Sequence, residues 1–285
     1  KPGPSLQTPE AADHRRCCPP PPRRIPRVLR GNGQSCVQTH YPGPETDHDS
    51  PPPTARRALL HHLIEELPSL GPQNLGQLRQ ALADGKRFFP GLQLSQVNGL
   101  DLDLSSCELT GSCFKEARFG HAQLSNANVQ GCCFQEALLW GADLSGLKAE
   151  QSFWHEADLS GSRMQQANFS DAVMHRCCLR GVIAASSTWH TARLVEADFR
   201  SGLDQLTDLG KADFNNADLS YALLQRANLH GANLIGCCLY GTSFCEADLR
   251  KADLRGCDLR NSKLEGALLE GARLEGALLP KGVKP

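Results

Sequence analysis

Arginine, tyrosine and histidine side chains recur at intervals of 20 residues in the second half of this chain. The clearest series reads Ser160, Arg180, Arg200, Ser220, Tyr240 and Arg260. If the chain coils with that period, these side chains stack on one surface. Guanidinium groups beside a phenol could bind an acidic protein surface or a phosphate-bearing ligand. A solvated surface of mixed charge is the alternative.

Two further series complete the set of candidate binding residues. One contains His155, His175, Val195, Asn215, Ile235 and Arg255, and the other His190, Gly210, His230 and Arg250. The pair His155 and His175 could bind a metal ion, but no third or fourth ligand stands near it in the sequence. The predicted partner-binding face therefore consists of Arg180, Arg200, Tyr240, Arg250, Arg255 and Arg260.

Signatures of catalysis are absent from the sequence. It contains no P-loop, no nucleotide-binding glycine fingerprint, no G-x-S-x-G and no H-E-x-x-H. The many Asp and Asn residues are better explained by hydrogen bonds to nearby backbone at turns. We therefore expect no catalytic residues, no cofactor and no metal site, and predict that the protein is not an enzyme.

The 13 cysteines follow a structural pattern. Cys107, Cys132, Cys177, Cys237 and Cys257 all stand where Ala usually stands, and no C-x-x-C pair with metal-ligand spacing occurs. Such cysteines behave as compact apolar side chains. Reduced, structural thiols indicate a cytoplasmic protein.

A five-residue register positions all of these residues. From Leu104 to Leu279 every fifth residue is large and apolar, except Ala149, Ala184 and Asp204. Two residues before each stands a small residue, most often Ala. Neither a helix of period 3.6 nor a strand of period 2 produces this spacing, so the chain forms a solenoid.

The repeated text A-D/N-L-x-x resembles the pentapeptide repeat family over about two thirds of the chain. Examples are Ala142-Asp143-Leu144, Ala217-Asp218-Leu219 and Ala252-Asp253-Leu254. The resemblance implies an all-β solenoid, a right-handed quadrilateral parallel β-helix with four pentapeptides per coil of 20 residues. It also implies that the large and the small residue point inward and that the other three positions face solvent.

Some residues depart from the register. Leu102, Leu147 and Val182 are large where small residues belong. Trp154 and Trp189 exceed the usual size, so we expect distorted, partly exposed coils there, and the stretch 181–190 is also expected to be irregular. Asp204 stands where a buried residue belongs, and a lone buried carboxylate is costly. A loop is therefore expected to leave the wall there and return in phase, with Leu203 or Leu206 in the core.

The N-terminal third divides into two segments. Residues 1–53 are rich in Pro and Arg, which predicts a disordered leader that acts as a secretion signal, a docking tail or merely a solvated extension. Residues 54–90 predict a short two-helix cap, whose second helix carries Leu75, Leu78, Ala81 and Leu82. Phe88, Phe89 and Pro90 are expected to form the contact between this cap and the repeat array at 91–285.

The charge and hydropathy of the chain restrict its partners. The formal net charge is −1, and no apolar run approaches the about 18 residues that a membrane span needs. We therefore expect neither nucleic-acid binding nor a membrane span, but a protein partner. The regular repeats up to Leu279 end without a capping helix, which suggests a homodimer through the C-terminal coil.

The resemblance leaves several functions open. The first is a non-enzymatic scaffold or interaction protein. The second is an effector injected into a host cell by a bacterial pathogen, or a substrate-positioning part of a larger enzyme such as a HECT-like ubiquitin ligase. The third is an inhibitor of DNA gyrase that mimics duplex DNA, which the array's arginines and its mild acidity argue against.

Overall fold

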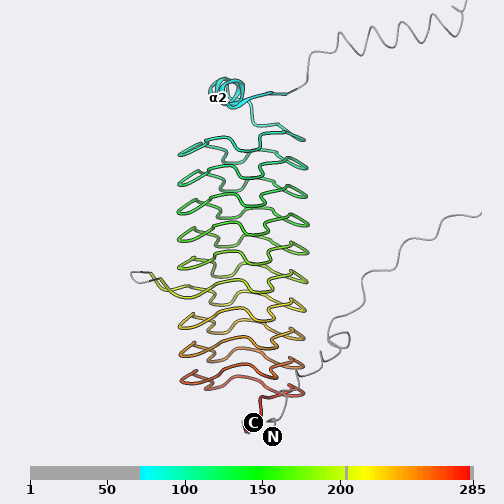
Figure 1. Cartoon of the computed structure of the whole chain (residues 1–285), viewed down its shortest axis with the longest axis vertical. Helices are drawn as coiled ribbons and strands as arrows, with labels where there is room; N and C mark the ends of the chain where they lie inside the picture. Colours follow the sequence, from blue (N-terminus) through cyan, green and yellow to red (C-terminus); the bar gives the residue numbers. More distant parts are fainter. Residues whose placement is uncertain (1–70, 203–204, 283–285) are drawn as a thin grey trace, which may run out of the picture. The chain divides into compact units, whose positions relative to one another are not determined.

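The computed structural model describes residues 71–202 and 205–282. The predicted leader and the first helix of the predicted cap lie outside these residues. Helix α2 spans Leu75–Ala83, and the side chain of Asn74 caps it by accepting a hydrogen bond from the Gln77 backbone N–H. Its Leu78 is fully buried. Figure 1 shows α2 at the N-terminal end of a stack of coils.

The coils are joined by single parallel bridges rather than by long strands. The first bridge joins Phe88 to Glu108 and the last joins Asp258 to Leu278. Up to the bridge between Cys178 and Asp198, each partner lies 20 residues ahead. A regular backbone pattern accompanies the bridges; for example, the Leu104 N–H donates to the Gln123 carbonyl at 2.7 Å. These bonds fix the coils at the spacing of a parallel sheet, about 4.8 Å.

A tight turn follows each large interior residue. The Cys107 N–H donates to the Leu104 carbonyl at 3.1 Å, and Ser106 has a φ of 56°. Type II turns require a positive φ at that position. Many non-glycine residues hold it here, which shows that the stacked backbone bonds outweigh the local cost.

The interior is filled by the two series predicted to point inward. The large residues from Leu104 to Leu259 and the small residues two positions before them are buried, wherever the structure describes them. Each buried Leu or Phe contributes about 2 kcal/mol of apolar transfer free energy. This interior column is therefore the main source of stability.

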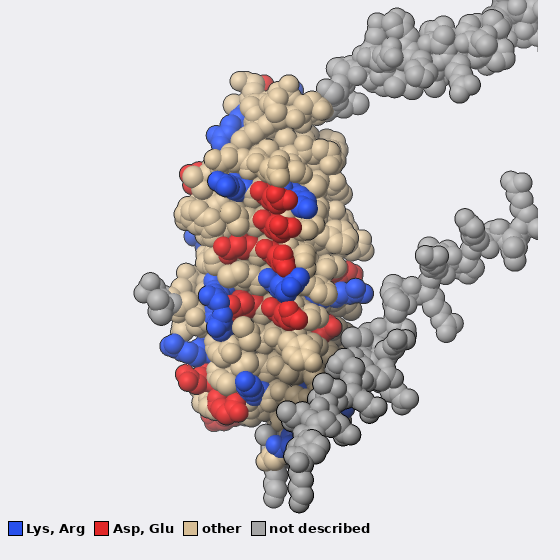
Figure 2. Space-filling view, viewed as in Figure 1, with Lys and Arg blue, Asp and Glu red and all other residues tan. Residues whose placement is uncertain are grey.

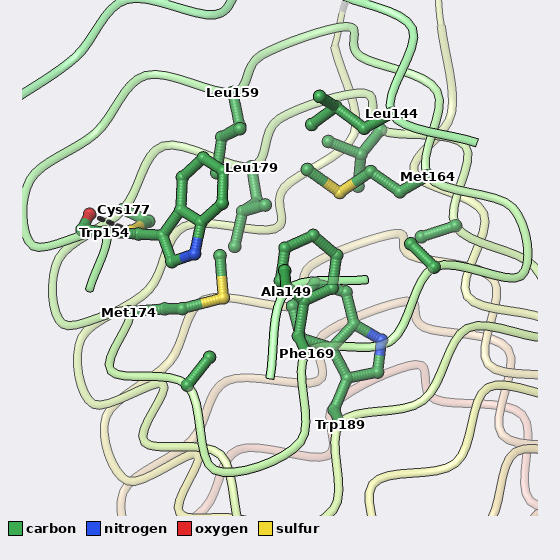
Figure 3. Packing of buried hydrophobic residues seen from close by; sticks show 14 of the residues in the cluster. Leu144, Ala149, Trp154, Leu159, Met164, Phe169, Met174, Cys177, Leu179 and Trp189 are labelled. Carbon is green, nitrogen blue, oxygen red and sulfur yellow. Dashed lines mark hydrogen bonds between the residues drawn. The ribbon is translucent and has the colours of Figure 1, made fainter. Parts of the chain in front are cut away.

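The expectation that Trp154 and Trp189 are partly exposed is wrong. Both are fully buried within regular coils (Figure 3). Trp154 stacks on Phe134 with ring centroids 4.1 Å apart, and Trp189 stacks on Phe169 at 4.5 Å. The stretch 181–190 also keeps the regular pattern of turns and bridges, contrary to expectation.

Serine residues make room for these indoles. The Trp154 Nε1–H donates to the hydroxyl of Ser152 at 2.6 Å, and the Trp189 Nε1–H donates to Ser187 at the same distance. The serines occupy the small inward position of the same pentapeptide. Each buried N–H is thus satisfied from within its own repeat.

The interruption predicted at Asp204 is confirmed by the bridges. Ile183 pairs with Asp208, 25 residues ahead, so one extra pentapeptide leaves the wall and the chain returns in phase. Leu206 does not enter the core, because it is 58% exposed. Thr207 and Leu209 take the small and the large interior places instead, and Leu203 lies outside the described residues.

Thr207 seals the gap that this excursion opens. In the regular pattern the Gly161 N–H donates to the Arg180 carbonyl, and Gly181 should donate likewise to Arg200. Instead, the Gly181 N–H donates to the Thr207 hydroxyl at 2.9 Å, and that hydroxyl donates to the Arg200 carbonyl at 3.1 Å. The excursion between Arg200 and Thr207 projects from one side of the stack (Figure 1).

The contact surface expected between cap and array is corrected in one respect. Phe89 is buried and begins the interior column, whereas Phe88 points outward and is 73% exposed. Because neighbouring residues of a wall segment point to opposite sides, only one of the two can face the core.

Candidate functional site

The bridges sort the outward side chains into four faces. We call one the Trp140 face and another the Cys113 face. A face comprises its bridged residues and the residue two positions after each. The Trp140 face has the bridged residues Asn98, Arg118, Leu138, Asp158, Cys178, Asp198, Leu223, Ser243 and Lys263. The Cys113 face has Gln93, Cys113, Cys133, Phe153, Val173, Arg193, Asp218, Cys238, Asp258 and Leu278.

The predicted series of stacked arginines does not stay on one face. The extra pentapeptide shifts every later residue by one face relative to a count in steps of 20. The prediction that these residues form a single column is therefore wrong beyond Arg200. Arg180 and Arg200 lie on the Trp140 face, Tyr240 and Arg260 on the Cys113 face, and Arg250 and Arg255 on the other two faces.

Each of these arginines is paired with an aspartate. Arg200, Arg250, Arg255 and Arg260 each clamp the Asp two residues earlier, with Nη2–Oδ2 distances of 2.7–2.8 Å. Arg180 reaches Asp198 on the next coil at 2.5 Å. The predicted basic column is thus largely neutralised by its own wall. The Tyr240 hydroxyl likewise accepts a hydrogen bond from Asn261 at 2.5 Å.

Asp198 shows what holds these pairs. Burial alone would raise the pKa of its carboxyl, but hydrogen bonds from Arg200 and Arg180 outweigh burial and lower the pKa below its usual value. Its Oδ1 also accepts the Arg200 backbone N–H at 3.1 Å. The same turn bond joins Asp143 to Ser145 and Asp158 to Ser160. The structural explanation predicted for the Asp residues is confirmed.

Three large apolar side chains gather at the N-terminal end of the Trp140 face. Leu100, Leu138 and Trp140 are 43%, 37% and 39% exposed. Together with Arg118 and Gly120 they line a hollow of about 290 Å³. Such a group on an otherwise polar wall is typical of a protein-binding surface.

The ring of Trp140 is held in place by its neighbours. It packs edge-on against His121, with ring centroids 4.5 Å apart. A Cβ atom at Gly120 would lie 2.7 Å from the indole, so a side chain there would displace it. The His121 backbone N–H donates to the Trp140 carbonyl at 3.0 Å. Trp140 is therefore a pre-organised anchor on rigid backbone.

A second concave region adjoins the excursion. It encloses about 670 Å³ and is lined by Leu206, Lys211, Arg226, His230 and Arg250, among others. Carboxylates are interspersed among these cations; Glu246, for example, lies 3.9 Å from Arg226. The mixture suits a polypeptide with polar groups of both kinds better than a free anion. Of the predicted site residues, this groove includes Arg250.

Sequence analysis missed Leu100, Leu138 and Trp140, although the register contained a signal for them. All three stand at positions that face solvent, where large apolar residues are unexpected. Leu100 and Trp140 are also 40 residues apart, which is two coils. Counting outward apolar residues by coil would have found this group.

Chemistry at the surface is limited within the described part of the chain. No three His, Cys, Asp or Glu side chains between residues 71 and 282, with 203–204 left aside, are grouped to hold a metal ion. The rings of His155 and His175 share a face, 6.5 Å apart. No helix that the structure describes is long and apolar enough to cross a bilayer. On the face drawn in Figure 2, acidic and basic side chains are interspersed.

Comparison with known proteins agrees with this geometry. The family model described as pentapeptide repeats matches eight copies, within residues 103–183 and 207–276, on either side of the excursion. No curated protein matches. Among solved structures, HetL, a pentapeptide repeat protein involved in heterocyst differentiation regulation from the cyanobacterium Nostoc sp. strain PCC 7120, is 30% identical. The match covers 75% of this chain and 100% of HetL, with a TM-score of 0.60.

Two other solved structures are more distant. QnrB1, a plasmid-mediated fluoroquinolone resistance protein, is 20% identical over 65% of this chain and 91% of its own, with a TM-score of 0.34. Rfr23 from the cyanobacterium Cyanothece 51142 is 17% identical over 72% and 97%, with a TM-score of 0.18. The register, the bridged coils and the match over more than half of the sequence lead to one conclusion: the chain belongs to the pentapeptide repeat family and folds as a right-handed quadrilateral β-helix.

Proposed function

We propose that this protein is a non-enzymatic scaffold that binds a protein partner through the Trp140 face. The observation that carries the proposal is the group formed by Leu100, Leu138 and Trp140 on an otherwise polar wall. Aromatic residues and arginine are enriched in protein interfaces, and truncation of a central Trp often costs the most binding free energy. Arg180 and Arg200 extend the same face toward the excursion.

The rigidity of the wall supports this role. Backbone hydrogen bonds between coils hold the anchors of the Trp140 face in place before a partner arrives. A partner therefore does not have to offset the entropy of ordering them. Arg180 and Arg200 share Asp198 and leave N–H groups directed at solvent, so they would orient an acidic rim rather than supply most of the affinity.

The test begins with identification of the partner by position-specific photo-crosslinking. A photoreactive residue replaces Leu138 in the full chain, and a second protein carries it at Phe153, which is 51% exposed on the Cys113 face. The purified partner is then titrated against Trp140→Ser, Leu138→Ser and the matched control Phe153→Ser. We expect Kd to rise at least about tenfold for the first two, because loss of an anchor costs about 2 kcal/mol.

Two results would count against this function. One is an unchanged Kd for Trp140→Ser and Leu138→Ser with every partner captured at position 138. The other is an equal loss of affinity in Phe153→Ser, which would indicate a general effect on the rod rather than recognition by this face.

We also propose that a second copy of the chain covers the apolar surface of the last described coil. Leu264, Leu269, Leu274 and Leu279 are partly exposed, whereas Leu259 one coil earlier is fully buried. A hollow of about 480 Å³ lies among Ala272, Leu274, Ala277 and Leu279. Sedimentation equilibrium should give a dimer that Leu274→Lys dissociates; a wild-type monomer at micromolar concentration would rule out this contact.

A further inference from the structure

Cys113 and Cys133 occupy successive rungs of the Cys113 face. They form a parallel bridge, and the Phe114 and Cys133 backbone N–H groups hold the two coils together at 2.7 and 2.9 Å from their acceptors. Both side chains face outward and are half-buried. The Cys133 thiol donates a hydrogen bond to the Cys113 sulfur. The wall thus presents two touching thiols in a fixed orientation.

The other outward cysteines at bridged positions lack such a neighbour. Cys178 lies between Asp158 and Asp198, and Cys238 lies between Asp218 and Asp258. Among the described residues, only at Cys113 and Cys133 do two outward-facing cysteines bridge each other. The stacked pair Cys237 and Cys257 is sealed in the interior, where both thiols donate to carbonyl groups.

We propose that Cys113 and Cys133 form a two-thiolate site for a soft monovalent cation of the Cu(I) class. Thiolates are the ligands that select Cu(I), and this ion accepts two of them in a line. Two metal–sulfur bonds of about 2.3 Å span about 4.6 Å, close to the coil spacing of about 4.8 Å. The site therefore needs little movement of the wall.

The same distances argue against the other common fates of a cysteine pair. A disulfide needs Cβ atoms about 3.5–4.5 Å apart, which is closer than in-register neighbours on adjacent coils. Structural zinc needs four ligands, and the described part of the chain offers no third His, Cys, Asp or Glu here. A digonal ion is the class that two ligands can hold.

Charge around the pair fits this assignment. Binding of Cu⁺ by two thiols releases two protons and leaves a complex of charge −1. Lys115, two residues after Cys113, supplies a nearby positive charge, although it also pairs with Glu116 at 3.5 Å. The Ser95 hydroxyl lies 3.6 Å from the Cys113 sulfur and could hydrogen-bond to it.

Competition for Cu(I) under anaerobic conditions tests the site. The reduced full-length chain is titrated against the chromophoric Cu(I) complex of bathocuproine disulfonate. We expect Cys113→Ser and Cys133→Ser each to lose one retained equivalent of Cu(I), while the matched control Cys238→Ser keeps the wild-type number. The cysteines outside the described residues are present in every variant, so their contribution cancels. X-ray absorption of the wild-type complex should show sulfur neighbours.

Three results would overturn the proposal. The first is retention of the wild-type number of Cu(I) equivalents by Cys113→Ser. The second is an equal loss in Cys238→Ser, which would indicate binding by any outward thiol. The third is a Cys113–Cys133 disulfide, detected by mass spectrometry after mild peroxide treatment, because the spacing argument requires that it not form. Circular dichroism of each variant confirms that the coil is intact, since Ser is nearly isosteric with Cys at this outward position.

Discussion

Two pairs of interior residues exchange size within one pentapeptide. Leu147 fills the small position while Ala149 fills the large one, and Val182 and Ala184 do the same. All four are fully buried, and the coils around them stay regular. The interior therefore constrains the summed volume of the two side chains more strongly than the order in which they occur.

The exchange at Leu147 and Ala149 can be tested by reversing it. Leu147→Ala alone should cost about 2–5 kcal/mol by opening a cavity, and Ala149→Leu alone about 1–3 kcal/mol by overpacking. The double variant restores the usual order, so we expect its unfolding midpoint in urea to lie closer to wild type than the sum of the singles predicts. Additive losses would show that the two positions do not share one volume.

The buried tryptophans show where reasoning from residue size failed. An indole seemed too large and too polar for a narrow interior. The sequence nevertheless contained the solution, because Ser stands two residues before both Trp154 and Trp189. The serine hydroxyl accepts the indole N–H and then donates to a backbone carbonyl, as Ser187 does to Ala184 at 2.6 Å. Size alone could not reveal this bond.

At the scale of the turn, the Asp before each large residue acts as a connector. Asp198 accepts the Arg200 backbone N–H and two guanidinium groups. The lowered pKa of Asp198 has a definite consequence for stability. A carboxyl whose folded pKa is depressed stabilises the fold above its unfolded pKa of about 3.9 and loses that contribution as pH falls through the folded pKa.

This linkage gives a prediction for Asp198→Asn. The variant should unfold more easily than wild type at pH 7, and the difference between the two should shrink below about pH 4. Urea unfolding between pH 2 and pH 7 measures it. Asp158→Asn is the matched control, because Asp158 accepts the same turn N–H from Ser160 but forms no ion pair within the described residues. A difference for Asp198→Asn that does not vary with pH would contradict the assignment.

At the scale of the whole molecule, the sequence predicted the coil but not its faces. A period of five was readable because inward positions must be apolar. An insertion of five residues preserves that period, so nothing in the register showed which residues were extra. The stacking of faces repeats every 20 residues, and here the insertion changed the answer. Arg180 and Arg200 therefore stayed together while Tyr240 and Arg260 moved to another face.

The excursion can be removed without breaking the wall. Deletion of residues 202–206 joins Ser201 to Thr207 and restores a spacing of 20 between bridged partners. We expect the shortened chain to keep the wild-type circular dichroism spectrum and to melt at the same temperature or higher. Deletion of 201–206 is the control, because it leaves a coil one residue short and should destabilise every later coil. If both deletions behaved alike, the described register would be wrong.

The extruded pentapeptide also fixes the azimuth of the rod. If residues 202–206 formed a side of the square instead, all coils after them would be turned by 90° relative to those before. Tyr240 and Arg260 would then continue the column of Arg200, and the Trp140 face would end in a different surface. That arrangement would put Asp204 in the apolar interior, where an unpaired carboxylate is costly. One acidic residue thus selects between two rotational settings, and with them the combination of surfaces that a partner spanning both halves would meet.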